Sequence, residues 1–256
     1  KNYGKFANLD MTGLTAGARV KNDEYDKASV NDFALWKFHS KEDGNVFWDT
    51  DVGKGRPGWH VEWSAMSMKY LGKTFDIHLG GIDLIFPHHQ NEIAQSEAST
   101  NKKFVNYWLH NAHLLVNGKK MSKSLGNFYT LRDLLNKWHE PSAIRYLLIS
   151  THYRQQLNLT DEAISASKRA IQRLNDFGFS QKTKQGKGAS IDKLLNRVKK
   201  DFEKHLDDDL NISAALASIF DFIRDINKLD INKQQSKKIL KQTEEFDKVL
   251  GVMTFK

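Results

Sequence analysis

The chain has 256 residues, no cysteine, and 39 lysine and arginine residues against 31 acidic ones, which gives a formal net charge of +8. The lack of cysteine excludes disulfides and thiolate metal ligands within the chain. Because no apolar run approaches the roughly 20 residues of a membrane-spanning helix, and no charged-then-apolar signal order opens the sequence, we expect a cytosolic protein without membrane contact. The positive charge favours a polyanionic partner, although a lysine-rich surface that serves solubility explains it equally well.

Irregular, largely polar sequence fills the first 55 or so residues. Its apolar and aromatic island, NDFALWKF (31–38), predicts a segment that packs against another part of the protein. The GRPGWH stretch (55–60) then places Trp59 after a turn rich in glycine and proline. A tryptophan there can cover a small substrate, although most tryptophans simply belong to a core.

The middle of the chain has the strand, helix, strand order of an α/β sheet. The FDIHLGG run from Phe75 predicts a short buried strand, and a helix opens near Pro87. YWLHNAHLLV (107–116) predicts a second strand, closed by the turn dipeptide Asn117-Gly118. Asp83 follows the first strand, where α/β sheets bind ligands, and its carboxylate can accept hydrogen bonds from a ribose hydroxyl or an amino group. An ordinary turn explains Gly-Gly-x-Asp as well.

The FPHHQNE stretch (86–92) raises the question of a metal. His88 and Glu92 are four residues apart, so a helix would place both side chains on one face. This spacing is typical of residues that hold a zinc ion.

Two lysines and two serines form the KMSKS stretch, Lys120–Ser124, after the second strand and its turn. A mobile loop with two ammonium groups and two hydroxyls suits a triphosphate, because point charges can follow the phosphates as negative charge grows on the leaving pyrophosphate. A surface pentamer without function is the alternative.

Helices dominate the remaining sequence. Thr130 and Asp133 predict a capping box for the helix LRDLLNKW, and Pro141 opens the next helix. Beyond Thr160 only helices are expected, with a mobile basic linker at 180–190. The apolar residues of the three expected stripes are Ile164, Ile171 and Leu174; Ile191, Leu194, Leu195, Val198, Phe202 and Leu206; and Ala215, Ile219, Phe222, Ile223 and Ile226.

Four blocks together resemble a known family: GRPGWHVEWSAM, FDIHLGGIDLIFPHHQNEIAQSEA, VNYWLHNAHLLVNGKKMSKSLGNFYTLRDLL and HYRQQLNLT. In this order and spacing they are similar to the second half of class I aminoacyl-tRNA synthetases, specifically of the cysteinyl-tRNA synthetase family. KMSKS alone indicates only class I, whereas the GWH and FPHH.NE blocks indicate cysteine. LDDDLNISAALASIFDFIRDIN (206–227) resembles the family's helical anticodon-side bundle.

The resemblance implies an α/β fold, the second half of a Rossmann-type class I synthetase core, followed by an α-helical bundle. It divides the chain into catalytic residues 1–128, stem-contact helices 129–159 and an anticodon-side bundle 160–256. The implied reaction joins ATP, with Mg²⁺, and cysteine into cysteinyl-adenylate and then transfers the cysteinyl group to tRNA(Cys). Positioning and charge stabilisation dominate catalysis in this class, so no general base is expected.

The resemblance also assigns roles to individual residues. The second lysine of KMSKS, Lys123, binds ATP and stabilises the transition state, and Lys120 assists it. Asp83 holds the substrate amino group, and Trp59 closes over the substrate in a pocket that His88 lines. The further residues expected at the nucleotide are Met121, Ser122 and Gly81.

Zinc is the point at which the sequence departs from the family. The family's ion binds the substrate thiolate and is held by two cysteines together with the residues that correspond to His88 and Glu92. Trp63 stands at the cysteine position of the GWH.EC block, and an indole nitrogen cannot ligate a metal. Our hypothesis is a zinc-free pocket in which Trp63 fills the vacated volume and the His88–Glu92 pair shapes the thiol site; metal analysis tests it.

The family's first half, with its HIGH motif, and its small C-terminal module have no counterpart in these residues, so the chain is expected to be a portion of a longer protein or a natural fragment. Two other functions stay open: a cysteine ligase that acts on a small amino sugar, and a non-catalytic remnant that binds RNA or a partner. We expect His110, His113 and His152 to be structural or pocket-lining, and the acidic run 207–209 to be a solvated helix end.

Overall fold

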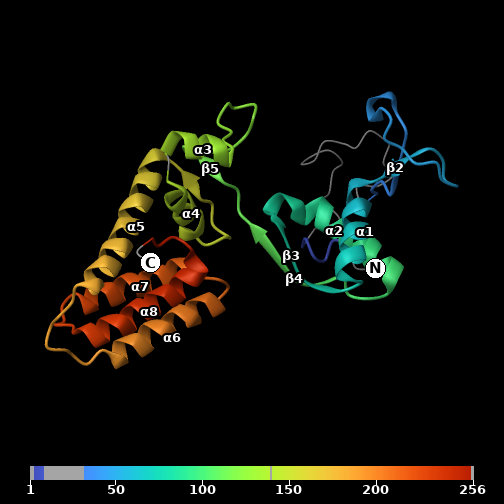
Figure 1. Cartoon of the computed structure of the whole chain (residues 1–256). Helices are drawn as coiled ribbons and strands as arrows, with labels where there is room; N and C mark the ends of the chain where they lie inside the picture. Colours follow the sequence, from blue (N-terminus) through green and yellow to red (C-terminus); the bar gives the residue numbers. More distant parts are fainter. Residues whose placement is uncertain (1–2, 9–31, 139, 255–256) are drawn as a thin grey trace. The chain divides into compact units, whose positions relative to one another are not determined.

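The computed structural model describes residues 3–8, 32–138 and 140–254, and Figure 1 shows them with the elements labelled. The chain divides into two compact units, Lys1–Asn111 and Ala112–Lys256. In the described residues, no helix is both long enough and apolar enough for a membrane crossing. The expected α/β region and the expected helical region are both present.

The first unit opens with a small antiparallel pair, β1 (Trp36–Phe38) and β2 (Gly55–Pro57). The second part of the NDFALWKF island therefore forms a strand that packs against the chain around GRPGWH, as expected; Asn31 lies outside the described residues. A short 3₁₀ helix, Lys41–Asp43, lies between the strands. Helix α1 (Trp59–Leu71) follows β2 directly and carries Trp59 at its first position.

A parallel βαβ unit forms the rest of the first unit. Strands β3 (Phe75–Gly81) and β4 (Val105–Asn111) pair in parallel from Phe75↔Val105 to Gly81↔Asn111, and helix α2 (Gln90–Thr100) connects them. A 3₁₀ turn (Ile82–Leu84) and a π turn (Ile85–His89) lead from β3 into α2, so the helix opens near Pro87 as predicted. The apolar core of this unit contains Phe75, Phe104 and Val105.

The prediction that β3 is a buried strand was wrong for one of its faces. Ile77 and Leu79 are 54% and 59% exposed, whereas the intervening His78 faces the side that α2 covers. Successive side chains of a strand point to opposite faces, so Ile77 and Leu79 point away from the face on which His78 lies. At the start of the strand Phe75 is buried because it packs against Phe104.

The second unit begins with a three-stranded sheet of short strands. β5 (Leu115–Val116) pairs antiparallel with β6 (Lys119–Lys120) and parallel with β7 (Asn158–Leu159). The predicted single strand 107–116 is therefore two strands, because residues 112–114 leave β4 and the Ala112 N–H donates to the Tyr153 carbonyl. The predicted turn is present: Asn117 and Gly118 have φ angles of 49° and 74°, as a type I′ hairpin requires.

Two helices follow the hairpin where the capping signals predict them. Helix α3 (Leu131–Trp138) starts after Thr130, whose hydroxyl donates to the Asp133 carboxylate at 2.7 Å and accepts from the Asp133 N–H at 3.2 Å. Helix α4 (Pro141–Ser150) has proline at its first position, where the missing N–H costs nothing.

The helical bundle contains α5 (Asp161–Lys182), α6 (Asp192–Asp207), α7 (Ile212–Ile226) and α8 (Lys233–Leu250), which Figure 1 shows side by side. The predicted apolar stripes line the core of this unit. Helix α8 adds Ile239, Phe246 and Leu250 to that core, and no expected stripe included it. The linker at 180–190 is partly the end of α5, and hydrogen bonds from Gly186 and Gly188 to the carbonyls of Ile231 and Asp230 hold the rest in place.

Candidate functional site

Five histidines gather around one buried carboxylate in the first unit. We call this group the histidine cluster; its members are His60, His78, His88, His89 and His110, with Glu92 at its centre. They come from α1, β3, the π turn, β4 and the first turn of α2. The alternation of the strands creates the cluster, because every second residue of β3 and β4 faces α2.

Glu92 is fully buried and holds two imidazoles through its two oxygens. Its Oε2 accepts a hydrogen bond from His78 Nε2 at 2.8 Å, and its Oε1 lies 3.2 Å from His88 Nε2. Burial would raise the pKa of this carboxyl, but the hydrogen bond from His78 and the nearby ring of His88 hold the pKa at about 2. The group is therefore an anion at neutral pH.

Two tryptophans contact the ring of His88. Trp59 stacks on it with centroids 4.0 Å apart, and Trp63 meets it edge-on at 6.2 Å with the planes at 89°. His60 approaches from the same helix, with the two Nδ1 atoms 2.7 Å apart. Trp59 and Trp63 are about half exposed, so this side of the cluster opens to solvent while Glu92 does not.

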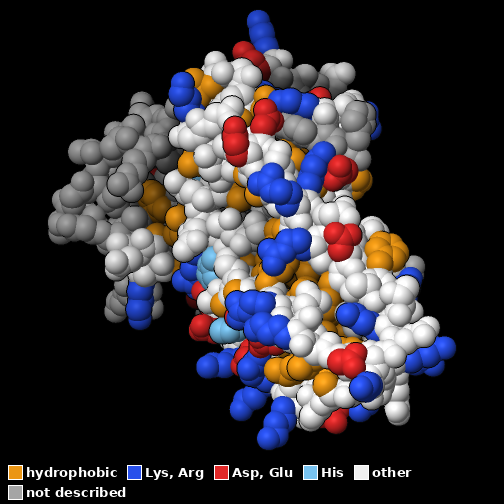
Figure 2. Space-filling model, turned by 90° about the vertical axis from the view of Figure 1, so that its left-hand side faces the viewer, with side chains coloured by type: hydrophobic (Ala, Val, Ile, Leu, Met, Phe, Trp, Pro, Cys, Tyr) orange, Lys and Arg blue, Asp and Glu red, His pale blue; other side chains and the backbone are white. Residues whose placement is uncertain are grey.

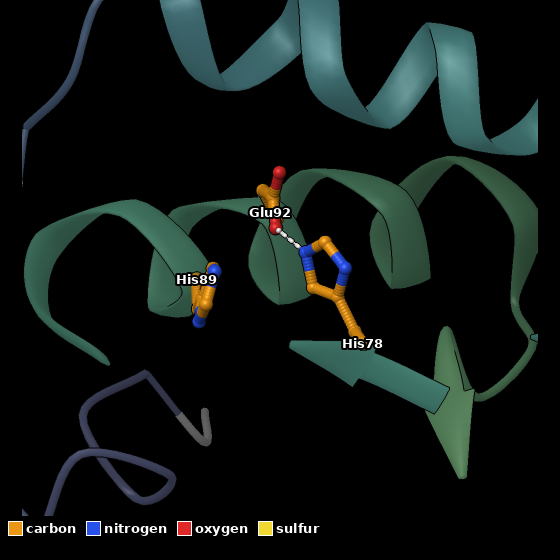
Figure 3. Close-up of side chains that lie close together, drawn as sticks. All are labelled: His78, His89 and Glu92. Atoms are coloured by element: carbon orange, nitrogen blue, oxygen red, sulfur yellow. Dashed lines mark hydrogen bonds and ion pairs between the residues drawn. The ribbon is translucent and has the colours of Figure 1, made fainter. Parts of the chain in front are cut away.

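His89 lies on the inner side of the cluster and is 1% exposed. Its Nδ1 is 2.7 Å from His110 Nε2, and burial lowers the pKa of His89 to about 3. His78, His89 and Glu92 each offer a ligand atom within 4.8 Å of the others, and Figure 3 shows the two rings on either side of the carboxylate. Sequence reasoning missed His78 and His89; the alternation of FDIHLGG places His78 on one face of its strand but does not indicate what that face meets.

Asp83 and Gly81 lie where the sequence predicts them. β3 ends at Gly81, and Asp83 follows in the 3₁₀ turn. The Asp83 carboxylate lies over Gly81, so closely that a Cβ on residue 81 would force this carboxylate to move.

The lysine loop, defined here as residues 120–128, belongs to the second unit. Asn127 braces it: the Ser122 N–H donates to Asn127 Oδ1 at 2.9 Å, and Asn127 Nδ2 donates to the Lys120 carbonyl at 3.2 Å. Met121 packs against the apolar core of the sheet and its helices. Lys123 is exposed, with its ammonium 5.7 Å from the centre of the Phe128 ring.

The other residues that the sequence singled out have simple environments. Asp209, in the acidic run 207–209, is bound by the segment that follows α4: Tyr153 donates its hydroxyl to the Asp209 carboxylate at 2.6 Å, and His152 Nε2 lies 2.9 Å from the Asp209 backbone carbonyl. Asp83 belongs to the first unit and Lys123 to the second. That both reach one nucleotide pocket stays a prediction.

The chain matches the family model of the class I (C) tRNA synthetase catalytic domain over residues 1–169 and the DALR domain model over residues 201–255. It therefore belongs to the class I tRNA synthetases of this family. A relative from Protochlamydia amoebophila (strain UWE25), named cysteine--tRNA ligase, is 53% identical over 263 residues, which cover 99% of this chain and 55% of the relative. A second relative with this name, from Brachyspira hyodysenteriae (strain ATCC 49526 / WA1), is 53% identical over 97% of this chain and 54% of its own length.

The chain thus spans about half the length of the curated relatives it matches. A solved structure also resembles it: a ternary complex of Agrobacterium radiobacter K84 LeuRS with tRNA and LeuAMS, with a TM-score of 0.57, covers 84% of this chain and 35% of that protein. At 14% sequence identity this likeness shows a shared fold only.

The described residues provide only part of the family's set of zinc ligands. Glu92 Oε1 accepts no hydrogen bond within these residues, and its ion-pair partner is His88 Nε2 at 3.2 Å. His88 is the one neighbouring donor at the family's positions, because Trp63 has no lone pair for a metal. Two ligands fall short of the three or four protein ligands of zinc sites, so the family's ligand set does not fit the residues described.

Proposed function

We propose that the protein activates cysteine with ATP, assisted by Mg²⁺, and transfers the cysteinyl group to tRNA(Cys). The observation that carries the proposal is the 53% identity, over nearly the whole chain, to a relative named for this reaction. Because the chain spans about half of that relative, the proposal concerns the full gene product.

In the proposed reaction the lysine loop binds the phosphates. Lys123 is exposed on a loop that Asn127 braces, so its ammonium can follow the pyrophosphate as charge develops on it. Lys120, at the end of β6, adds a second positive charge, and Met121 and Ser122 complete the nucleotide contact. These side chains stabilise charge and do not transfer protons.

The amino acid is proposed to bind in the first unit. The Asp83 carboxylate, just beyond β3, pairs with the substrate ammonium, with Gly81 beside it. Trp59 covers the substrate from the stack that it forms with His88, and Trp63 closes the same side of the pocket.

The acceptor is proposed to be tRNA and not a small amino sugar. Three features favour a polyanion: the net charge of +8, the match to a DALR domain, and the exposed lysine and arginine side chains that Figure 2 shows in blue. A charging assay with tRNA(Cys), compared with an amino-sugar acceptor, separates the two alternatives. Preferential modification of the sugar would favour the second.

Cysteine-dependent exchange between ATP and pyrophosphate tests the activation step, and intact-mass measurement of the gene product shows whether the remaining half is present. Lys123→Ala is expected to lower the exchange rate by about 100- to 1,000-fold, the usual effect of removing one charge-stabilising donor. Lys119→Ala, an exposed lysine of the same hairpin, is the matched control and should retain the rate. No exchange in a complete, folded wild-type protein would favour a non-catalytic remnant.

A further inference from the structure

The residues that follow α4 bind the helical bundle at the turn between α6 and α7. Tyr153 donates its hydroxyl to the Asp209 carboxylate at 2.6 Å. Arg154 Nε lies 2.9 Å from the Tyr153 hydroxyl oxygen and 2.8 Å from Asp209 Oδ2, so the three groups contact one another. His152 Nε2 lies 2.9 Å from the Asp209 carbonyl. Three successive residues of the chain thus contact one residue of the turn.

The turn that these residues contact has an unusual backbone. Asp209 and Leu210 have φ angles of 54° and 56°, in the left-handed region that residues other than glycine rarely adopt. The Leu210 side chain is 51% exposed, so its burial does not compensate for this conformation. Backbone hydrogen bonds from Leu210 to Leu206 and from Asn211 to His205 close the end of α6. The contacts that Asp209 receives from outside the turn therefore stabilise a conformation that the local sequence disfavours.

The same segment leads into the sheet that carries the lysine loop, within the second unit. The Tyr153 carbonyl accepts from the Ala112 N–H at 2.8 Å, and the Leu157 carbonyl accepts from the Leu115 N–H at 2.8 Å. β7 then pairs with β5, and β5 pairs with β6, where Lys120 begins the lysine loop. Tyr153 therefore holds the chain beside the sheet through its backbone and contacts the bundle through its side chain.

We propose that Tyr153, paired with Asp209, is a positioning residue that fixes the bundle relative to the lysine loop for transfer of the cysteinyl group to tRNA. The inference rests on the proposed function and deepens it. A tRNA that contacts the bundle and the nucleotide-binding loop at once depends on the distance between the two. Activation of cysteine involves no tRNA and does not depend on where the bundle lies. The contact therefore acts on the second step of the reaction and not on the first.

The experiment compares two assays on the full gene product. Tyr153→Phe keeps the ring and removes the hydroxyl that contacts Asp209 and Arg154. The KM for tRNA(Cys) in charging should rise by about tenfold, because a loosely held bundle lowers the effective concentration at which the second contact forms. Cysteine-dependent pyrophosphate exchange, measured without tRNA, should stay at the wild-type rate. The matched control is Tyr70→Phe, the same change at a tyrosine of α1 that is 76% exposed, and it should leave both assays unchanged.

Two further measurements separate positioning from a general effect on folding. Asp209→Ala should raise the same KM, and the double variant with Tyr153→Phe should match Asp209→Ala alone, because both changes remove one shared contact. Amide hydrogen exchange of residues 208–211 should be faster in Tyr153→Phe while the melting temperature stays at the wild-type value, since only the turn is loosened.

A wild-type KM for tRNA(Cys) in Tyr153→Phe would overturn the proposal. So would an equal loss in charging and in pyrophosphate exchange, which would assign Tyr153 to activation or to folding. A wild-type protein without pyrophosphate exchange would overturn the proposed function and, with it, this role in transfer. Amide exchange of the turn tells the two failures apart, because it reports on the contact between Tyr153 and Asp209 without turnover.

Discussion

Trp59 stacks on His88 with ring centroids 4.0 Å apart and planes 26° apart, at the first residue of α1. Offset stacking of this kind contributes about 0.5–1.5 kcal/mol beyond area burial. The same contact orients an indole over the outer side of the histidine cluster, where the proposed substrate pocket lies.

Replacing Trp59 tests this arrangement. Trp59→Ala should raise the KM for cysteine by about two- to tenfold, because the indole would no longer cover the substrate; such a change corresponds to about 0.5–1.5 kcal/mol of binding free energy. Trp59→Phe, which retains an aromatic face, should restore most of the affinity. Tyr70→Ala on the same helix is the control, because this side chain is 76% exposed and lies outside the cluster. An unchanged KM in Trp59→Ala would show that the indole does not cover the substrate.

Asn127 is expected to organise the lysine loop for catalysis. Asn127→Ala removes the acceptor for the Ser122 N–H and the donor to the Lys120 carbonyl. Each hydrogen bond contributes about 0.5–1.5 kcal/mol, so the rate of pyrophosphate exchange should fall by about tenfold. Because the loop is at the surface, the melting temperature should stay near that of the wild type. A normal rate would mean that the loop does not need this brace.

Ionised Asp43 should stabilise the first unit, and this stabilisation should be lost at acid pH. The hydrogen bond from Arg56 Nε at 2.8 Å, and those from Ser40, lower the pKa of Asp43 to about 2 from its ordinary 3.8. A lowered pKa means that the ionised form stabilises the fold. Its contribution is complete above about pH 3.8 and disappears as the pH falls through about 2.

An NMR titration of the Asp43 carboxyl measures this effect. Arg56→Gln should move the pKa of Asp43 back toward 3.8, because it removes the largest cause of the shift. Arg154→Gln, in the second unit, removes a different ion pair and should leave Asp43 unaffected. A low pKa that persists in Arg56→Gln would assign the shift to Ser40.

Gln235 should protect the loop between α5 and α6 from proteolysis. Its side chain accepts from the Ala189 N–H at 3.1 Å and donates to the Ala189 carbonyl. Gln235→Ala removes both contacts and the Gln235 side-chain half of the capping box of α8, so trypsin should cleave faster after Lys184 and Lys187. Gln234→Ala, an exposed neighbour on the same helix, should cleave at the wild-type rate. Equal rates for both variants would contradict the anchoring role.

The sequence by itself determined the local features of this protein and its family. The turn at Asn117-Gly118, the capping box of Thr130 with Asp133 and the apolar stripes of the bundle were all predicted and are all present. Each depends on residues close in the chain, whose chemistry limits the backbone choices. The order of the motif blocks likewise identified the family that the comparisons show.

Only the tertiary structure decided the histidine cluster, the exposure of one face of β3, and the anchoring of the linker. His60, His78, Glu92 and His110 lie on four elements, and no spacing rule predicts which of them meet. The pair His88 and Glu92 was visible because both lie within one stretch of sequence; the ring of His78, which is 2.8 Å from Glu92, was not. Contacts of this kind depend on how a parallel strand pair packs against its crossover helix, which is a property of the assembled sheet.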